Sequence, residues 1–345
     1  MTISVRSARY DSDERELTDV LQMNLPYRPH AHYFRWLYRD NPSGEALAWV
    51  ATDPGTNKLV GAAAAFPRLV YCDGREARGY VLGDFCIHPR YRSLGLALAL
   101  QRACLDGLSA ADADFAFDFP SQGMLAIYSR LHIPVNEVVV RHVRPLRADR
   151  QIEKAVPVPV VARGLTAMIN ACLRCRDNAI ARKDDWIIAP EQGPWGEEFT
   201  GAALRWSPAG AVTIARTADY LNWRYRKHPQ HAYWMLGARR RGNLGGYLIY
   251  HANGNVCIID DLVAEDRSAY RTLLMECATF LRKEGIHTIS MPWPLNDPGR
   301  SLLRTSGFRA RESSPAVVLP FDRQTRQFVG QAHITWYLCH GDWEV

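Results

Sequence analysis

Short apolar runs alternate with longer amphipathic stretches along the chain, and this pattern predicts a sheet flanked by helices. In the first half, strands are expected at residues 48–52, 59–65, 79–87, 115–119 and 135–143. Helices are expected at 94–108, where apolar positions recur at helical spacing, and at 123–131. Such a succession of strands and helices is typical of an α/β (α+β) protein built on one sheet.

The pattern of the first half returns later in the chain. Residues 33–42 and 220–229 share a Tyr, Trp, Tyr, Arg and Pro at matching places, and the two tryptophans are Trp36 and Trp223. Each segment is followed by two strand patterns, the second of which holds an aspartate, and then by a helical pattern. Because the same succession of elements recurs, we interpret the two halves as copies of one fold.

Prolines and basic residues mark the boundary between these copies. Residues 144–150 are basic, and further prolines follow at positions 157 and 159. We therefore expect a first domain at 1–146, a linker with a helix at 147–199, and a second domain at 200–345. A chain of 345 residues fits two domains.

Composition excludes several classes of protein. With 47% hydrophobic residues the chain is not disordered, and its net charge of +6 is too diffuse to predict a nucleic-acid partner. Of the eight cysteines only Cys172 and Cys175 form a C-x-x-C pair, so we expect no metal site. The polar start and the lack of a long apolar run predict a cytoplasmic protein with no membrane span.

The segment at residues 81–97 carries the clearest chemistry. A strand pattern ends at Pro89, a turn with Arg90 and Arg92 follows, and a helix begins near Ser93. The first turn of a helix has unpaired N–H groups and a positive dipole end, which suit a pyrophosphate. A glycine at position 95 lets a ligand approach the backbone closely. The segment therefore predicts an anion-binding strand, loop and helix.

Two motifs resemble the GNAT N-acetyltransferase superfamily. Residues 92–97 fit the R/Q-x-x-G-x-G/A loop that binds acyl-CoA in that family, and residues 85–92 are similar to the strand end before it. The Ser at 121 and Tyr128 resemble the second signature of the family. There, His132 and Ile133 replace the usual Gly and Phe.

The second half resembles the same family less closely. Its corresponding loop carries Glu265 and Asp266 where a glycine is expected, and acids there would repel a pyrophosphate. The whole chain is similar to tandem-GNAT proteins among exopolysaccharide and cell-envelope enzymes. This resemblance implies two tandem GNAT-like domains, each with a mixed, mostly antiparallel sheet flanked by helices, of which the second is degenerate.

The resemblance also implies a cofactor site and a reaction. Acetyl-CoA or another acyl-CoA would be the co-substrate, and a primary amine would attack its thioester directly. The residues expected to bind the cofactor are Phe85, Cys86, Ile87, Arg92, Ser93, Leu94, Gly95, Leu96, Ala97 and Ser121. Tyr128 would donate a proton to the departing thiolate, and Asp84 would take the proton of the amine.

Other residues compete for these roles. Alternation of side chains along a strand places Asp84, Cys86 and His88 on one face, so Cys86 is a candidate nucleophile and His88 a candidate base. Two weaker candidate bases are Asp118 and His132.

Three residues of the repeated segments are expected near the acceptor. The residues concerned are Trp36, Trp223 and Asp261. The tryptophans could stack on a sugar or belong to the core. The carboxylate of Asp261 could pair with a cationic amine or lie in a solvated turn.

The function predicted from these features is acyl-CoA-dependent N-acylation, with acetyl transfer to a primary amine of a small molecule or amino sugar. Two alternatives remain at this stage. The acyl donor could be an acyl-carrier protein or an aminoacyl-tRNA, or the protein could be a CoA-binding scaffold or sensor without turnover.

Overall fold

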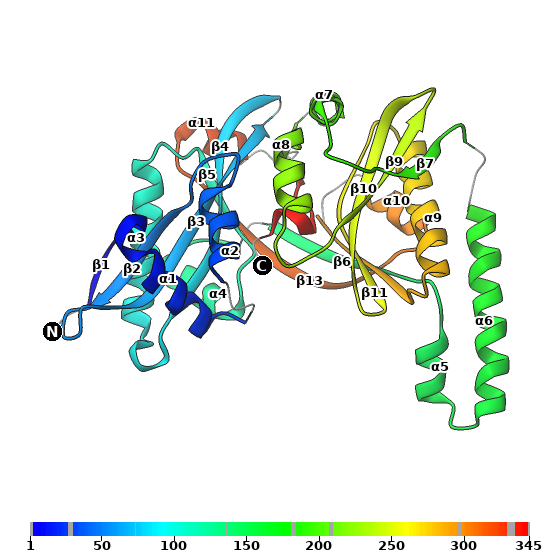
Figure 1. Cartoon of the computed structure of the whole chain (residues 1–345), viewed down its shortest axis with the longest axis horizontal. Coiled ribbons are helices and arrows are strands. Elements are labelled where there is room, and N and C mark those ends of the chain that lie inside the picture. Colours follow the sequence, from blue (N-terminus) through cyan, green and yellow to red (C-terminus); the bar gives the residue numbers. More distant parts are fainter. Residues whose placement is uncertain are drawn as a thin grey trace.

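The structure is a computed structural model that describes residues 3–26, 30–72, 74–135, 137–180, 184–206, 210–294, 299–329 and 335–343. The N-terminal half and the C-terminal half lie next to each other (Figure 1). Helices α5 (Asp149–Ala155) and α6 (Pro159–Ile180) form a hairpin at the outer side of the second half.

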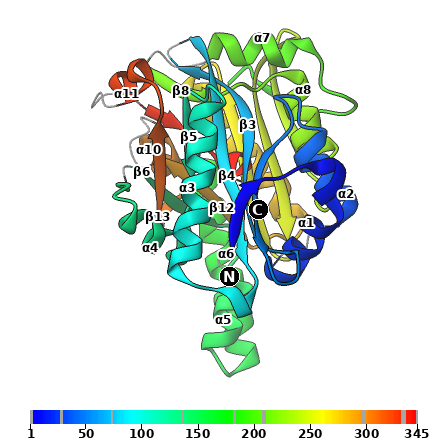
Figure 2. The same cartoon turned by 90° about the vertical axis from the view of Figure 1, so that its left-hand side faces the viewer.

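The first half follows the predicted order of elements. Its strands are β1 (Ser4–Ser7), β2 (Leu47–Asp53), β3 (Lys58–Cys72), β4 (Arg75–Ile87) and β5 (Phe115–Asp118). Its helices are α1 (Tyr10–Asn24), α2 (Ala31–Phe34), α3 (Leu94–Ala110) and α4 (Gln122–Arg130). Helix α1 buries Leu17 and Leu21 on one face of the sheet, and α3 buries Leu100 and Cys104 on the other. Figure 2 shows α3 running along the sheet.

The second half repeats this arrangement. Its strands are β7 (Ile187–Pro190), β8 (Ala211–Ile214), β9 (Trp234–Arg240), β10 (Asn243–Asn253), β11 (Val256–Ala264), β12 (Thr288–Pro294) and β14 (Thr335–Tyr337). Its helices are α7 (Glu197–Trp206), α8 (Ala218–Leu221), α9 (Arg267–Lys283), α10 (Arg300–Thr305) and α11 (Arg323–Val329). The helical pattern that follows the second repeated segment is α9.

Two strands cross between the halves. Strand β6 (Glu137–Pro145), expected to close the first domain, pairs with β12 and with β13 (Arg309–Pro320). Strand β13 in turn pairs with β5, so the order β5, β13, β6, β12 joins both halves in one sheet. Three strand pairs, β4 with β5, β11 with β12 and β8 with β14, are parallel, and the other pairs of the described sheet are antiparallel. The predicted mixed, mostly antiparallel sheet is therefore confirmed.

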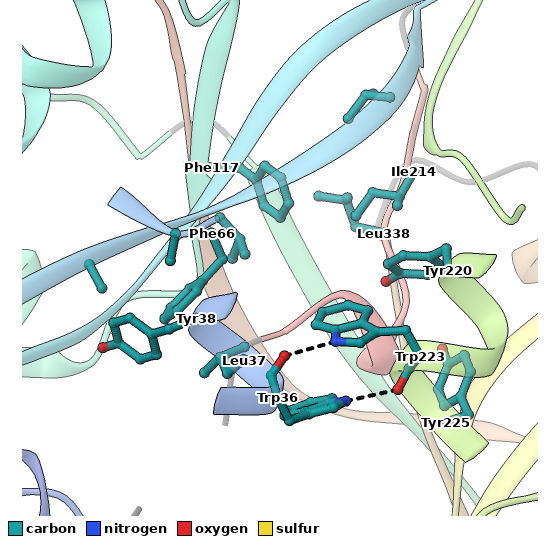
Figure 3. Packing of buried hydrophobic residues seen from close by; sticks show 14 of the residues in the cluster. Trp36, Leu37, Tyr38, Phe66, Phe117, Ile214, Tyr220, Trp223, Tyr225 and Leu338 are labelled. Carbon is teal, nitrogen blue, oxygen red and sulfur yellow. Dashed lines mark hydrogen bonds between the residues drawn. The ribbon is translucent and has the colours of Figure 1, made fainter. Parts of the chain in front are cut away.

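The repeated tryptophans form the centre of the contact between the halves. Each lies in a short π-helical turn, Arg35–Arg39 or Asn222–Arg226. The Nε1–H of Trp36 donates to the carbonyl oxygen of Trp223 at 2.9 Å. In return, the Nε1–H of Trp223 donates to the carbonyl oxygen of Trp36 at 2.9 Å (Figure 3). The rings stack with centroids 5.0 Å apart at 19°. These reciprocal bonds relate the two copies by an approximate twofold.

We expect Trp223→Phe to destabilise the chain by about 1–3 kcal/mol, because it removes one donor and leaves the buried carbonyl of Trp36 without that partner. Chemical denaturation followed by circular dichroism measures this loss. The matched control is Trp234→Phe, at a side chain that is 50% exposed, which should change the free energy of unfolding by less than about 0.5 kcal/mol. Equal stability of both variants would contradict the proposed contribution of the paired bonds.

The missing Gly-Phe of the second signature does not change the backbone. His132 takes the left-handed conformation with φ 57°, as Gly307 does with φ 85° at the end of α10. The N–H of Ile133 donates to the carbonyl oxygen of Tyr128 at 2.9 Å, and the N–H of Phe308 donates to the carbonyl oxygen of Leu303 at 3.0 Å. Both copies therefore end this helix with the same turn, and His132 accepts the conformation that glycine usually supplies.

Candidate active site

A β-bulge sets the direction of the side chains at the end of β4. Ala64 pairs with Gly83 and Ala62 with Cys86, so two residues of β4 lie opposite Ala63. Asp84 lies in this bulge with φ 49°, a conformation that aspartate tolerates better than most residues. Strict alternation would put residues 81 and 86 on opposite faces. The extra residue instead brings Val81 and Cys86 into the same buried cluster.

Asp84 pairs with a tyrosine of the repeated segment. The hydroxyl of Tyr38 donates to Oδ2 of Asp84 at 2.6 Å. Burial raises the pKa of Asp84 to about 7, so its carboxyl group changes charge near neutral pH. The sequence analysis identified Asp84 but gave Tyr38 no role. The position of Tyr38 in the repeated segment was the signal that could have identified it.

A groove of about 710 Å³ opens beside the bulge, where β4 and β5 diverge. Its lining includes eight of the ten predicted cofactor residues: Phe85, Cys86, Ile87, Arg92, Ser93, Leu94, Ala97 and Ser121. The other two lie on the same helix, Gly95 exposed and Leu96 buried. Sequence reasoning missed Asn24, Met124 and Ile127, which also line the groove. These belong to α1 and α4, and no motif marks them.

The N-terminus of α3 lies at one end of this groove. The Oγ of Ser93 accepts the N–H of Leu96, and the Nε–H of Arg92 donates to the carbonyl of Ile87 at 3.0 Å. A Cβ added to Gly95 would have no atom within 4 Å, so the backbone there is open to a ligand. The helix start, Arg92 and the exposed glycine together suit a phosphate group. Ser121 likewise caps α4, with Oγ accepting the N–H of Met124.

Tyr128 lies behind the wall of the groove. It is 1% exposed, and its hydroxyl donates to Oδ2 of Asp118 at 2.5 Å. Burial raises the pKa of Asp118 to about 6, although the bond from Tyr128 lowers it. Because Asp118 ends β5 where that strand leaves β4, the pair is next to the gap between the strands. The role of Tyr128 as a proton donor stays a prediction.

We expect Tyr128→Phe to lower kcat about 100-fold in acyl transfer, because loss of a general acid typically costs that much. The dissociation constant of acetyl-CoA should not change, since Tyr128 is absent from the groove lining among the described residues. Steady-state thiol release measures kcat, and calorimetry measures binding. Tyr71→Phe, beside the turn between β3 and β4, is the control. An unchanged kcat would assign Tyr128 a purely structural role.

The remaining candidates lie in different settings. Burial raises the pKa of Cys86 to about 12, so its sulfur is a neutral thiol at physiological pH and a poor nucleophile. The side chain of His88 accepts the N–H of Arg90 and caps the turn Pro89–Tyr91. His132 is exposed in the turn after α4.

The three predicted acceptor residues are enclosed in this structure. Trp36 and Trp223 are 4% and 3% exposed and stack on each other. Asp261 is 0% exposed, and its Oδ2 accepts bonds from Arg216 at 3.0 Å and from Tyr225 at 3.2 Å. Tyr225 and Asp261 thus repeat the pair of the first half, but with a buried guanidinium against the carboxylate.

The loop of the second half differs from that of the first. Oδ1 of Asp266 accepts the N–H of Ala269 at 2.7 Å and so occupies the start of α9. Glu265 pairs with Arg240 at 2.9 Å. Carboxylates at this helix start take the place that an anion would need, which agrees with the predicted loss of the loop.

Among the described residues, no group of His, Cys, Asp and Glu side chains is arranged to hold a metal ion. Within the same residues, no helix is both long and apolar enough to cross a membrane.

Comparisons with known proteins give one family match and several similar folds. Residues 14–120 match the model of the acetyltransferase (GNAT) family. The fold is similar to that of a probable N-acyltransferase from Enterococcus faecalis V583, with TM-score 0.68 and 13% identity over 94% of this chain and 74% of that chain. It is also similar to a GCN5-related N-acetyltransferase from Anabaena variabilis ATCC 29413, with TM-score 0.65 and 13% identity over the same shares.

A third solved structure is an N-myristoyltransferase from Saccharomyces cerevisiae with bound myristoyl-CoA. Its TM-score is 0.57 at 12% identity, over 92% of this chain and 82% of that chain. A search of curated proteins gave no match. The family match and the similar folds together support an acyltransferase. Residues 14–120 are thus similar to the acetyltransferase (GNAT) family, whose members use acyl-CoA as co-substrate.

Proposed function

We propose that the chain transfers an acyl group, acetyl in the simplest case, from CoA to a primary amine of a small molecule or amino sugar. The observation that carries this proposal is Asp84, a carboxyl group with a pKa of about 7 in the bulge of the strand that lines the groove. A base is most effective when its pKa lies near the working pH. Asp84 would take the amine proton there.

The groove residues support the binding of the donor. The backbone N–H groups at Arg92–Ala97 would hold the pyrophosphate, and those at Phe85–Ile87 would hold the pantetheine arm and polarise the thioester carbonyl. Tyr128, backed by Asp118, would protonate the thiolate. Direct attack by the amine is favoured over an acyl-enzyme because the only thiol in the described lining, that of Cys86, is held protonated.

We assign the two copies different tasks. The first domain, proposed at 1–146, would carry the donor site, and the linker at 147–199 would lead to the second domain at 200–345. This second domain would wall the acceptor side and bind no CoA. Support comes from the acidic residues that occupy the start of α9.

Calorimetry with acetyl-CoA and myristoyl-CoA, followed by a thiol-release screen over amino sugars, amino acids and polyamines, tests the proposal. We expect binding of an acyl-CoA and amine-dependent release of CoA. Binding without release for any amine would favour a sensor or scaffold. No binding of either donor would favour an acyl-carrier protein or an aminoacyl-tRNA as donor and would overturn the assignment of CoA.

A further inference from the structure

A carboxylate in the second half holds two imidazole rings at once. Asp260 lies on β11, at a bulge against β10, and its side chain is 2% exposed. One of its oxygens lies 2.7 Å from Nδ1 of His251, and the other lies 2.7 Å from Nδ1 of His340. His251 belongs to β10, and His340 opens the short turn His340–Asp342 near the end of the chain. Three separate segments therefore meet at one buried carboxylate.

The ionised carboxylate of Asp260 decides which nitrogen of each ring carries a proton. Burial by itself would raise the pKa of Asp260, but the bonds from His251 and His340 lower it below its usual value. An ionised carboxylate only accepts hydrogen bonds, so each Nδ1 carries its proton toward Asp260. A neutral imidazole protonated on Nδ1 has its lone pair on Nε2, at the far side of the ring.

Both Nε2 atoms point away from the carboxylate that holds the rings. The side chains of His251 and His340 are 11% and 22% exposed, more than that of Asp260. In the part of the chain that the structure describes, neither Nε2 has a hydrogen-bond partner. In its neutral form, each ring thus offers one hydrogen-bond acceptor, at Nε2, to a ligand.

The neighbouring rings are polar and uncharged. His231 lies 5.5 Å from His251 and 4.9 Å from His228 between ring centroids. Burial and the nearby Arg224 lower the pKa of His228 to about 2, and burial together with His251 lowers the pKa of His231. Tyr233 completes the group at 5.3 Å from His251. Such a surface suits neutral hydroxyl groups better than a second ammonium, because Arg224 already places a positive charge close to His228 and His231.

Ring contacts through a tryptophan link the cluster to the end of β5 in the first half. The ring of Trp343 lies 5.2 Å from His340 and stacks on Phe119 at 4.7 Å and 26°. Phe119 follows β5, two residues before Ser121 of the groove lining. Arg224 fixes this arrangement by donating to the carbonyl oxygens of Gly341 and Trp343 at 2.7 and 3.0 Å.

The two sites also share one face of the sheet. Cys86 and Phe117 belong to the same buried cluster as Trp336 and Leu338, which lead directly to His340. Figure 1 shows this last segment, in red, between the two halves. One buried cluster therefore connects the segment that leads to His340 with Cys86 of the groove lining.

We propose that His251 and His340, positioned by Asp260, form a binding subsite for the hydroxyl groups of a polyhydroxylated amine acceptor. The inference rests on the proposed N-acyl transfer and adds the recognition of the acceptor by the second half. Each Nε2 accepts a hydrogen bond from one hydroxyl, and Trp343 offers a ring face beside them. A simple alkylamine gains nothing from this subsite.

Matched acceptors test the inference. The probes are D-glucosamine against cyclohexylamine, which lacks the hydroxyls, and 1,4-diaminobutane against butylamine, which lacks the second ammonium. For the native chain we expect kcat/KM to favour D-glucosamine over cyclohexylamine. In His340→Phe this preference should fall about tenfold, the value of one hydrogen bond, while turnover of cyclohexylamine is retained. His32→Phe, at an exposed position on α2, is the control and should keep the preference.

Each other outcome contradicts the inference. An equal loss with all four amines in His340→Phe would give the cluster a structural role. A loss confined to 1,4-diaminobutane would assign it to an ammonium group. A preference that His340→Phe leaves intact would place hydroxyl recognition elsewhere.

A measurement on the native chain separates the two proposals and needs no variant. At a pH where the two imidazoles are neutral, D-glucosamine, but not cyclohexylamine, should shift the ¹⁵N signals of their Nε2 atoms in long-range ¹H–¹⁵N spectra. If no amine releases CoA but the shift occurs, the transfer reaction is wrong and the subsite stands. If CoA is released but D-glucosamine produces no shift, the subsite is wrong and the transfer reaction stands.

Discussion

The variant Asp84→Asn is expected to lower kcat about 1,000-fold with any amine acceptor, because it removes the proposed base without changing the shape of the bulge. Asparagine tolerates the left-handed conformation that residue 84 adopts with φ 49°. It also keeps an oxygen that can accept the hydroxyl of Tyr38. The dissociation constant of acetyl-CoA should stay unchanged, since the backbone of the groove is preserved. Thiol release and calorimetry measure the two effects.

The pH dependence gives a second test of Asp84. Only the deprotonated carboxylate accepts a proton, so kcat/KM of the native chain should rise as pH increases through about 7. Asp106→Asn, at an exposed position on α3, should keep both kcat and this profile. A profile without an inflection near neutral pH, or near-normal turnover in Asp84→Asn, would rule out Asp84 as the base.

Stability should change in the opposite direction to activity. Burial raises the pKa of Asp84 from 3.8 to about 7, so the folded state binds this proton more tightly than the unfolded state does. The free energy of unfolding then falls as pH rises from about 4 to about 7. Asp84→Asn lacks this charge and should melt at a higher temperature than the native chain at pH 8. A lower Tm for the variant at that pH would show that Asp84 stabilises the fold.

Replacement of Gly95 by Trp should weaken acetyl-CoA binding at least about 100-fold. The site of the new Cβ has no atom within 4 Å, so the fold accommodates the indole, which then covers the start of α3 where the pyrophosphate would bind. Calorimetry measures the dissociation constant.

The chain offers a close control for this substitution. Gly164 is also an exposed helical glycine with no atom within 4 Å of an added Cβ, but it lies on α6 in the linker. Gly164→Trp should bind acetyl-CoA like the native chain. Unaltered binding in Gly95→Trp, with the same melting temperature as the control, would exclude this loop as the CoA site.

The sequence by itself determined the features that depend on neighbouring residues. Hydrophobic spacing located β2, α3 and α4 close to their observed bounds, because local periodicity reflects which face of an element is buried. It found β3 and β4 but missed the seven residues at the end of β3 and the four at the start of β4. The loop before α3 was recognisable because its glycine and helix start are consecutive in the chain. The repeat was visible because both copies keep Trp36 and Trp223 for the same packing reason.

The alternation of side chains along β4 could not predict the bulge at Asp84. One extra residue reverses the face of every side chain before it, and nothing in the local pattern of β4 marks that shift. The pairing of Tyr38 with Asp84 joins residues 46 positions apart and follows from the bulge. Only the tertiary structure therefore decided which group faces the carboxylate and raised its pKa.

The tertiary structure also decided that β6 and β13 cross between the halves. The pattern of each strand predicts a strand but not its partners, which depend on the packing of both halves together. Asp260, His251 and His340 likewise come from segments up to 89 residues apart in the chain. Local sequence specifies elements and loops, whereas long-range contacts decide which side chains meet, because those contacts depend on the free energy of the whole packed chain.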